Sequence, residues 1–504
     1  MANGVAQSNA PPANAPFSTL MCWISPPRIT PCANAVMIEP AANAKVHARL
    51  LTPSDYGLVT MASSFTAIGW LLATVGAAPA IVQRPTVSEG LLRSLATLGL
   101  VFGLALWLLL ALGAGLIAGF FGEPAVRGVV IASAAIFPLA SAGTVPEGLL
   151  QRDLRFGRLV AIDMVILAVS SAGSVAMALH GYGVWSLVVP NLVGTGLRSL
   201  LLLLGTPWRP RLGFDAAEVK GVLGFTGSVL GVNVLQYFAR NADSIVIGRR
   251  LGTLDLGIYE YAYRLYMYPL EVITLVLISV MFPTLAGMQN DRAAMGRAFL
   301  RANGAIALAT FPMMIGLAVV ADPFVRVVLG EKWTAVIPLV QILAPLGAFS
   351  SLTATTGQVF LATGNAALRF GWAATYTSII VASFVIGANW GIIGVASAYT
   401  IAMVPIGLVG FRLALGLVGL PMSALWATLW KTTVASAAMA AVVSGVQMAL
   451  RAAGAGNLAI LLTCVPFGAG LYIALVWAVR PEALPDLLRV LPPWLVPTAL
   501  RIET

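Results

Sequence analysis

The chain has 504 residues, of which 59% are hydrophobic and only 10% are charged. Soluble domains carry about 25% charged residues, so this composition excludes a water-soluble enzyme fold and indicates an integral membrane protein. The 29 Lys and Arg residues outnumber the 19 Asp and Glu residues and give a net charge of +10, an excess that membrane proteins place in cytoplasmic loops rather than in a nucleic-acid patch.

The first segment, residues 1–46, is atypically polar. Four prolines, Arg28 and Glu39 interrupt the stretch at 21–44, which is unsuited to an ordinary membrane helix. No positive residue precedes its short apolar run at 17–24, as a signal peptide requires. We therefore expect either an N-terminus that is not the original start of the protein or a divergent external arm.

Thirteen apolar segments of membrane-spanning length follow. They are predicted at residues 57–78, 94–121, 128–147, 159–180, 183–206, 221–243, 256–286, 301–321, 335–361, 369–388, 391–413, 430–450 and 456–478. One set of alternating loops holds 17 Lys and Arg residues and the other holds 9. Because the richer side is cytoplasmic, we expect the tail after residue 479 inside and the segment before residue 57 outside.

An internal repeat is visible behind these spans. Short motifs recur in the same order at offsets of 201, 208 and 208 residues, which favours a duplicated unit of six spans. The pairs are Arg49–Gly57 with Arg250–Gly257, Gly122-Glu123 with Gly330-Glu331, and Gly183 with Gly391. An even number of spans makes the two copies parallel. The repeat also predicts a first span near 21–44, where the sequence has none.

The predicted fold is therefore all-α and polytopic, with two parallel six-helix lobes around a central cavity and two further helices. The N-lobe is expected at 47–206 and the C-lobe at 207–413, with the first helix missing or disrupted. Residues 414–504 are expected to form the two extra C-terminal spans and a cytoplasmic tail.

Polar residues inside the spans are the candidates for function, because charges there cost about 2.5–3.5 kcal/mol each on insertion scales. On the span at 256–286, Glu260, Arg264 and Glu271 share one helical face, with Tyr263 and Tyr266 beside them. One interpretation is an i,i+4 ion pair inside an interfacial tyrosine belt. The other is an arginine aimed into a cavity, where its guanidinium suits phosphate oxygens.

The preceding span carries a second polar stripe, formed by Thr226, Asn233, Gln236 and Arg240. It favours a wet cavity, and the alternative is hydrogen bonding between packed helices. Arg198 lies in the middle of another span, whereas Asp163 is expected to pair locally or to reach the interface. The predicted substrate-binding set is Arg264, Arg240, Arg198, Gln236, Asn233, Glu260, Tyr263 and Glu271.

Several chemistries find no support in the sequence. None of the four lysines follows a glycine, which excludes a Walker A loop, and His47 and His180 are the only histidines. We expect no catalytic residue, cofactor or metal, and no nucleic-acid partner. The turn at Glu331-Lys332-Trp333 is predicted to be external, with an interfacial tryptophan of structural role.

Five motifs in order resemble those of the bacterial polysaccharide and O-antigen flippases, within the multidrug/oligosaccharidyl-lipid/polysaccharide exporter superfamily. They are Ala48–Gly57, Asp243–Gly248, Leu256–Leu265, Met281–Thr284 and Gly330–Trp333, and the resemblance covers roughly residues 47–480. It departs from the family where the first span belongs.

The resemblance implies a multi-pass protein of the bacterial inner membrane that is not an enzyme. It implies that an undecaprenyl-diphosphate-linked oligosaccharide crosses to the outer leaflet by alternating access, for exopolysaccharide or lipopolysaccharide synthesis. Membrane lipids, a polysaccharide polymerase and export machinery are the implied partners. The alternatives are a drug or metabolite antiporter of the same superfamily, which needs a cavity carboxylate and an aromatic pocket, and a membrane polysaccharide polymerase or ligase.

Overall fold

The computed structural model describes residues 41–74, 81–82, 86–211, 213–215, 241–270, 281 and 284–480, and the regular elements in these stretches are helices. The first group comprises α3 (Ala41–Leu50), α4 (Pro53–Thr74), α6 (Glu89–Phe121), α7 (Ala125–Ala134), α8 (Ile136–Arg152), α9 (Phe156–Leu179) and α10 (Trp185–Gly205). Residues 241–270 are also helical, with a turn at Gly252, whose φ is 88°. The remainder comprises α12 (Arg292–Val319), α13 (Ala321–Val328), η1 (Glu331–Trp333), α14 (Val336–Thr353), α15 (Thr356–Ala362), α16 (Ala366–Gly387), η2 (Ala388–Trp390), α17 (Gly391–Leu417), α18 (Met422–Ala452) and α19 (Asn457–Val479).

These helices confirm an all-α polytopic membrane protein. Within the described residues, nine helical segments are long and apolar enough to cross a bilayer. Two predicted spans are each divided, 128–147 between α7 and α8 and 335–361 between α14 and α15. Residues 21–40 of the stretch at 21–44 and residues 221–240 of the predicted span at 221–243 lie outside the described residues.

Local sequence explains where α4 begins. Thr52 and Asp55 form a capping box, in which the Asp55 Oδ2 accepts from the Thr52 backbone N–H at 2.9 Å and the Thr52 Oγ1 accepts from the Asp55 N–H at 3.3 Å. Pro53 lies at the first helical position, where its missing N–H costs nothing. This start fixes Gly57 on the first turns of α4.

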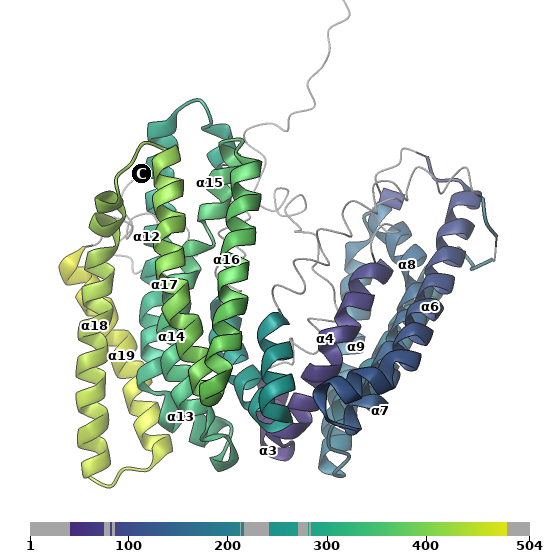
Figure 1. The fold of residues 1–504 in the computed structure, drawn as a ribbon, viewed down its shortest axis with the longest axis horizontal. Coiled ribbons are helices and arrows are strands. Elements are labelled where there is room, and N and C mark those ends of the chain that lie inside the picture. The colour runs from purple at the N-terminus through teal and green to yellow at the C-terminus, as the bar shows by residue number, and fades with distance from the viewer. Residues whose placement is uncertain are drawn as a thin grey trace, which may run out of the picture.

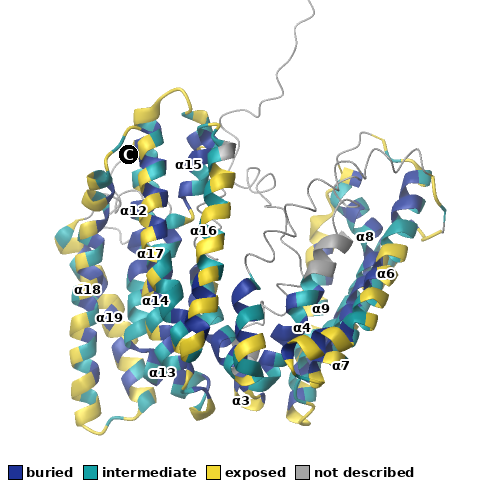
Figure 2. Ribbon diagram, viewed as in Figure 1, coloured by how far each residue is buried: buried dark blue, intermediate teal, exposed yellow. Residues whose placement is uncertain are grey.

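The helices form two bundles that meet at one end (Figure 1). Helices α4 and α6–α9 lie in one bundle, which we call the N-bundle together with α10 and with α3, which packs on α9. Helices α12–α19 lie in the other, the C-bundle. The 241–270 helix is counted with the C-bundle, because its Tyr266 and Leu270 side chains lie 3.0 Å from a Cβ built on Gly347 of α14. The ribbons approach each other where α3 and α13 lie and diverge toward the opposite end. We call the α3–α13 end the external end, following the charge count in the loops. Figure 2 shows buried segments concentrated there and exposed residues along the outer faces of α6 and α18.

The buried core reflects this arrangement. One large cluster runs from Tyr56 of α4 through Tyr261 to Trp333 and Leu339, and so joins the two bundles. The last two helices use a separate cluster, in which Met439 and Cys464 pack against Leu308 of α12. The Tyr472 hydroxyl of α19 also donates to the Leu308 carbonyl at 2.9 Å, which satisfies a buried polar group.

The two bundles cross in backbone contact at the external end. A Cβ built on Gly57 would lie 1.9 Å from the Thr253 carbonyl oxygen, and one built on Gly257 would lie 1.7 Å from the Pro53 carbonyl oxygen. Small residues of this kind let membrane helices approach closely. These are the two glycines that the internal repeat aligns, so equivalent positions of the two copies touch each other.

We expect Gly57→Ala to destabilise the protein. The new methyl group would collide with backbone, which cannot rotate away as a side chain can, and overpacking of this kind costs about 1–3 kcal/mol. The thermal midpoint of the purified protein should fall. Gly113→Ala on α6 is the matched control, since a Cβ there meets nothing within 4 Å. Its midpoint should stay level or rise, and equal midpoints for the two variants would contradict the close crossing.

Candidate functional site

Arg264 lies at the boundary between the bundles. Its Nε donates to the Glu260 Oε1 at 3.0 Å, and the two side chains are only 20% and 15% exposed. Its guanidinium carbon lies 6.0 Å from the ring centre of Tyr56, which belongs to α4 of the N-bundle. The predicted i,i+4 ion pair is therefore confirmed, and the arginine also faces the opposite bundle.

The tyrosines beside Arg264 pack inside the protein. Tyr263 makes an edge-to-face contact with Tyr266, with ring centres 5.0 Å apart, and a stacked contact with Tyr259 at 6.2 Å. Tyr266 is 1% exposed, so the prediction of an interfacial tyrosine belt is wrong for this residue. The reason is that these rings fill the core between the 241–270 helix and its neighbours, where their apolar area is removed from lipid contact.

Asp243 is a buried carboxylate near this aromatic group that the predicted substrate-binding set does not include. It is 6% exposed, and its Oδ1 accepts from the Ser244 backbone N–H at 2.8 Å. The sequence signal that could have singled it out is the single acid in the apolar run at 242–248. A carboxylate held there is a functional-site candidate because burial of such a group is costly.

Arg198 occupies a different place, inside the N-bundle. Its Nη1 and Nη2 donate to the two oxygens of Glu147 on α8 at 2.8 and 3.1 Å, and its Nε donates to the Asp163 Oδ1 on α9 at 3.0 Å. The predicted local pairing of Asp163 is confirmed. The three side chains form a partly buried triad that joins α8, α9 and α10, with charge-assisted bonds in a fork geometry.

The remaining predicted substrate-binding residues cannot be placed. Five of the predicted polar residues lie outside the described residues: Thr226, Asn233, Gln236, Arg240 and Glu271. The structure therefore brings Glu260, Tyr263 and Arg264 together and separates them from Arg198, which belongs to the α8–α10 triad.

The contact that closes the external end contains a residue that the sequence analysis interpreted differently. Trp333 is fully buried, and its Nε1 donates to the Ala48 carbonyl of α3 at 2.7 Å. Its ring centre lies 4.4 Å from that of Tyr261 and 5.7 Å from that of Tyr56. The prediction of an interfacial tryptophan is wrong because Gly330, at φ 101°, starts a turn that directs the indole between the bundles.

Two cations strengthen this closing contact. The Lys332 Nζ donates to the carbonyls of Arg49 and Leu51 at 2.9 and 2.5 Å, where α3 ends and leaves carbonyls without helical partners. The Arg49 Nη2 donates in return to the Val327 carbonyl near the end of α13 at 2.7 Å. Partial burial lowers the pKa of Lys332, and the charge of Asp55 opposes this shift.

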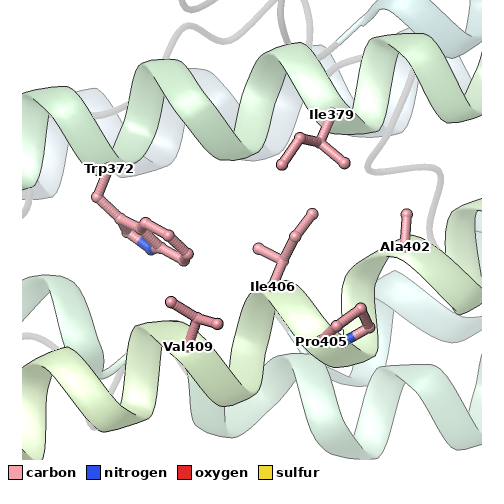
Figure 3. Close-up of a pocket in the computed structure, with 6 residues that line it drawn as sticks. All are labelled: Trp372, Ile379, Ala402, Pro405, Ile406 and Val409. Atoms are coloured by element: carbon pink, nitrogen blue, oxygen red, sulfur yellow. The ribbon is translucent and has the colours of Figure 1, made fainter.

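An apolar groove lies between α16 and α17, away from these charges (Figure 3). Its volume is about 270 Å³, and it is lined by Trp372, Ile379, Ala402, Pro405, Ile406 and Val409. The Pro405 ring interrupts the helical hydrogen bonding of α17 beside it. With no charged group in its lining, the groove suits hydrocarbon and does not suit a phosphate.

Comparison with known proteins places these features in context. A family model described as polysaccharide biosynthesis protein matches residues 46–338. The chain is 29% identical over 428 residues to the teichuronic acid biosynthesis protein TuaB of Bacillus subtilis (strain 168), covering 84% of this chain and 88% of that protein. It is 26% identical over 362 residues to the lipopolysaccharide biosynthesis protein WzxC of Escherichia coli (strain K12), covering 71% and 74%.

A solved structure shares the fold. The lipid II flippase MurJ, in an inward closed conformation, superposes with a TM-score of 0.69 at 16% sequence identity, covering 89% of this chain and 98% of that chain.

We predict that Arg198→Gln destabilises the N-bundle. The change leaves Glu147 and Asp163 close together without their cation, and breaking a buried pair costs about 3–5 kcal/mol, an upper bound here because the carboxylates are 20% and 29% exposed. The thermal midpoint of the purified protein should fall, and Glu147→Gln in the same background should recover part of the loss. A stable Arg198→Gln protein that no longer supports transport would instead assign Arg198 to the substrate.

Proposed function

We propose, from the premise that this chain belongs to the polysaccharide biosynthesis protein family, that it is a flippase for a lipid-linked oligosaccharide. It moves the oligosaccharide from the inner to the outer leaflet for the synthesis of an exopolysaccharide or lipopolysaccharide. The cargo is an undecaprenyl-diphosphate carrier with its sugars. The chain acts as a transporter and not as an enzyme, because the cargo changes side and no covalent bond is made.

The position of Arg264 is the observation that carries this proposal. A diphosphate and its sugars lose their water when they enter a bilayer, and an unpaired anion there is very costly. A guanidinium fork matches phosphate oxygens in geometry and charge. Arg264 is held by Glu260 inside the membrane and faces Tyr56 of the other bundle, so it lies where cargo would pass between the bundles.

The contacts at the external end support alternating access as the mechanism. In the described residues, Trp333, Lys332 and Arg49 join the two bundles there, which is the arrangement of a state closed to the outside. Release to the outer leaflet requires these contacts to open while the opposite end closes. The lipid tail stays among acyl chains throughout, where apolar surfaces such as the α16–α17 groove accept it.

The proposed cargo indicates where the protein acts and which proteins use its product. An undecaprenyl-linked oligosaccharide is made on the cytoplasmic face, so the protein would lie in the bacterial inner membrane. Its product would be used by a polysaccharide polymerase and by export machinery on the outer face. The path that includes Arg264 and Tyr263 is proposed to be lined also by Arg240, Gln236, Asn233 and Glu271. Arg198 is proposed to bind the cargo only if phosphate oxygens replace its carboxylate partners.

A second candidate is a drug or metabolite antiporter, and one observation favours it. Asp243 is a buried carboxylate near a group of packed tyrosines that includes Tyr259 and Tyr263, the combination that a cation antiporter needs. The two functions separate by substrate. Loss of an antiporter raises sensitivity to cationic drugs, whereas loss of the flippase leaves lipid-linked oligosaccharide in the inner leaflet.

We expect a strain that lacks this protein to accumulate lipid-linked oligosaccharide that cannot be reached from outside. The measurement is the fraction of the oligosaccharide that an impermeant sugar-oxidising or enzymatic reagent modifies in intact spheroplasts. The same gene supplied in trans should restore access. Unchanged externalisation in the deletion strain would reject the flippase.

We expect Arg264→Ala to abolish polysaccharide export while membrane abundance stays normal, because the cation for the diphosphate is lost. Arg264→Lys should restore export only in part, since a point charge replaces the fork. Arg155→Ala is the control, because the Arg155 side chain is 56% exposed and, among the described residues, makes only a long ionic contact to Asp153 at 3.9 Å. Full export by Arg264→Ala would show that the arginine only anchors its helix.

A further inference from the structure

The last two helices, α18 and α19, have no part in the contacts so far assigned to transport. They pack on α12 and α13 through a core of their own, in which Val443 and Tyr472 contact Leu308 and Val320. An accessory hairpin of this kind could simply occupy lipid. The charged end of the hairpin indicates a further role, because Arg451 there contacts α13, beside the residues that close the external end.

Arg451 on the last turn of α18 is held from two sides. One of its Nη atoms is paired with an Asp322 oxygen on α13. The Gln447 amide oxygen accepts from the same Arg451 nitrogen at 3.0 Å. In this orientation the Gln447 amide nitrogen donates to the Val319 carbonyl at 3.1 Å. A cation at a helix C-terminus is favourable in addition. The guanidinium therefore has a defined position on α13.

The charge pairing continues from Asp322 toward the N-bundle. The other Asp322 oxygen accepts from the Arg326 Nε at 2.8 Å, and the Arg326 Nη1 is paired with the Glu331 carboxylate. Four side chains of alternating charge thus connect α18, α13 and η1. Isolated exposed ion pairs contribute little, but a network in which each group fixes its neighbour is the exception.

Glu331 is the first residue of the η1 turn, and the next two residues of this turn contact the N-bundle. Lys332 donates to the Arg49 and Leu51 carbonyls, and Trp333 donates to the Ala48 carbonyl. Since η1 is a single 3-10 turn of three residues, fixing the Glu331 carboxylate restricts where the lysine and the indole can lie. The network therefore ends at the closing contact itself.

The geometry points to Arg451 as a positioning residue for the external closure, acting through Asp322, Arg326 and Glu331 on Lys332 and Trp333. The accessory hairpin thereby sets how firmly the two bundles are held together at this end. This inference goes beyond the proposed function, because it concerns the closing contact and holds for any cargo.

The test uses a buried reporter at the closing contact. Ala48 is fully buried, and only its backbone oxygen accepts from Trp333, so Ala48→Cys leaves that hydrogen bond intact. The full chain, with Cys22 and Cys32 replaced by Ser and Cys464 by Ala, is purified in phosphatidylglycerol and phosphatidylethanolamine nanodiscs. The rate of modification by a charged maleimide then reports how often the external end opens.

We expect Arg451→Gln to raise this rate by about fivefold, because loss of a network charge shifts a two-state equilibrium by roughly that factor. Arg451→Lys should bring the rate most of the way back. Trp333→Ala is the positive control and should raise the rate strongly. Lys431→Gln is the matched control on the same helix and should leave the rate unchanged. Lys431 lies in the N-terminal half of α18, where its Nζ donates to the Arg480 carbonyl at 3.4 Å.

Glu331→Gln keeps α18 and its packing intact and should also raise the rate, so the inference is tested even if Arg451→Gln fails to fold. Combining the two substitutions should add nothing to the larger single effect, since both break one chain of contacts. A parental rate in Arg451→Gln and Glu331→Gln, with Trp333→Ala still raised, would overturn the inference. An equal increase in Lys431→Gln would overturn it too. The modification rate does not depend on transport. A failure of the proposed function would therefore be seen in the oligosaccharide accessibility measurement and not in this rate.

Discussion

The close crossing of two backbones at the external end is the constraint on which the rest of the arrangement depends. Gly57 and Gly257 leave no room for a side chain between α4 and the 241–270 helix, so the position of one bundle at this end fixes that of the other. Aromatic rings and hydrogen bonds pack around the crossing: Tyr56, Tyr261 and Trp333 fill space there, and Lys332 donates to carbonyls where α3 ends. The contact therefore combines close backbone packing with directional hydrogen bonds.

The crossing also decides where Arg264 lies. From Gly257 to Arg264 the helix makes about two turns, which carry the arginine from the crossing toward the membrane interior. There it is close enough to Tyr56 to lie over its ring, yet its Nε is held by Glu260 from the same helix. A change at the external contact therefore moves the surroundings of the arginine as well, which is the coupling that alternating access needs.

The sequence predicted the parts of this structure that depend on neighbours in the chain. Hydropathy located the described spans, although α12 and α18 begin at Arg292 and Met422, ahead of the predicted starts at 301 and 430. Helical spacing predicted the Glu260–Arg264 pair. The burial of Trp333 could not be predicted in this way, because Ala48 and Tyr56 lie more than 270 residues earlier in the chain and Tyr261 comes from a third helix. The same limit applies to Arg198. The sequence predicted a charged residue in the middle of a span, but its partners Glu147 and Asp163 lie on α8 and α9 and meet it only when the N-bundle has folded.

Arg198 and Arg264 differ in what they offer an anion. The Arg198 triad carries two carboxylates for one guanidinium, so it is net negative, and a diphosphate that approached would have to displace both acids against their repulsion. The Glu260–Arg264 pair is neutral as a pair, and its cation lies against an aromatic face at the bundle boundary, where the ring quadrupole leaves the guanidinium charge in place. The pair itself therefore adds no excess of negative charge for an anion that binds there, and the further carboxylate near the same tyrosines is that of Asp243. On electrostatic grounds, therefore, Arg198 suits the cohesion of the N-bundle and Arg264 suits recognition of a phosphate passing between the bundles.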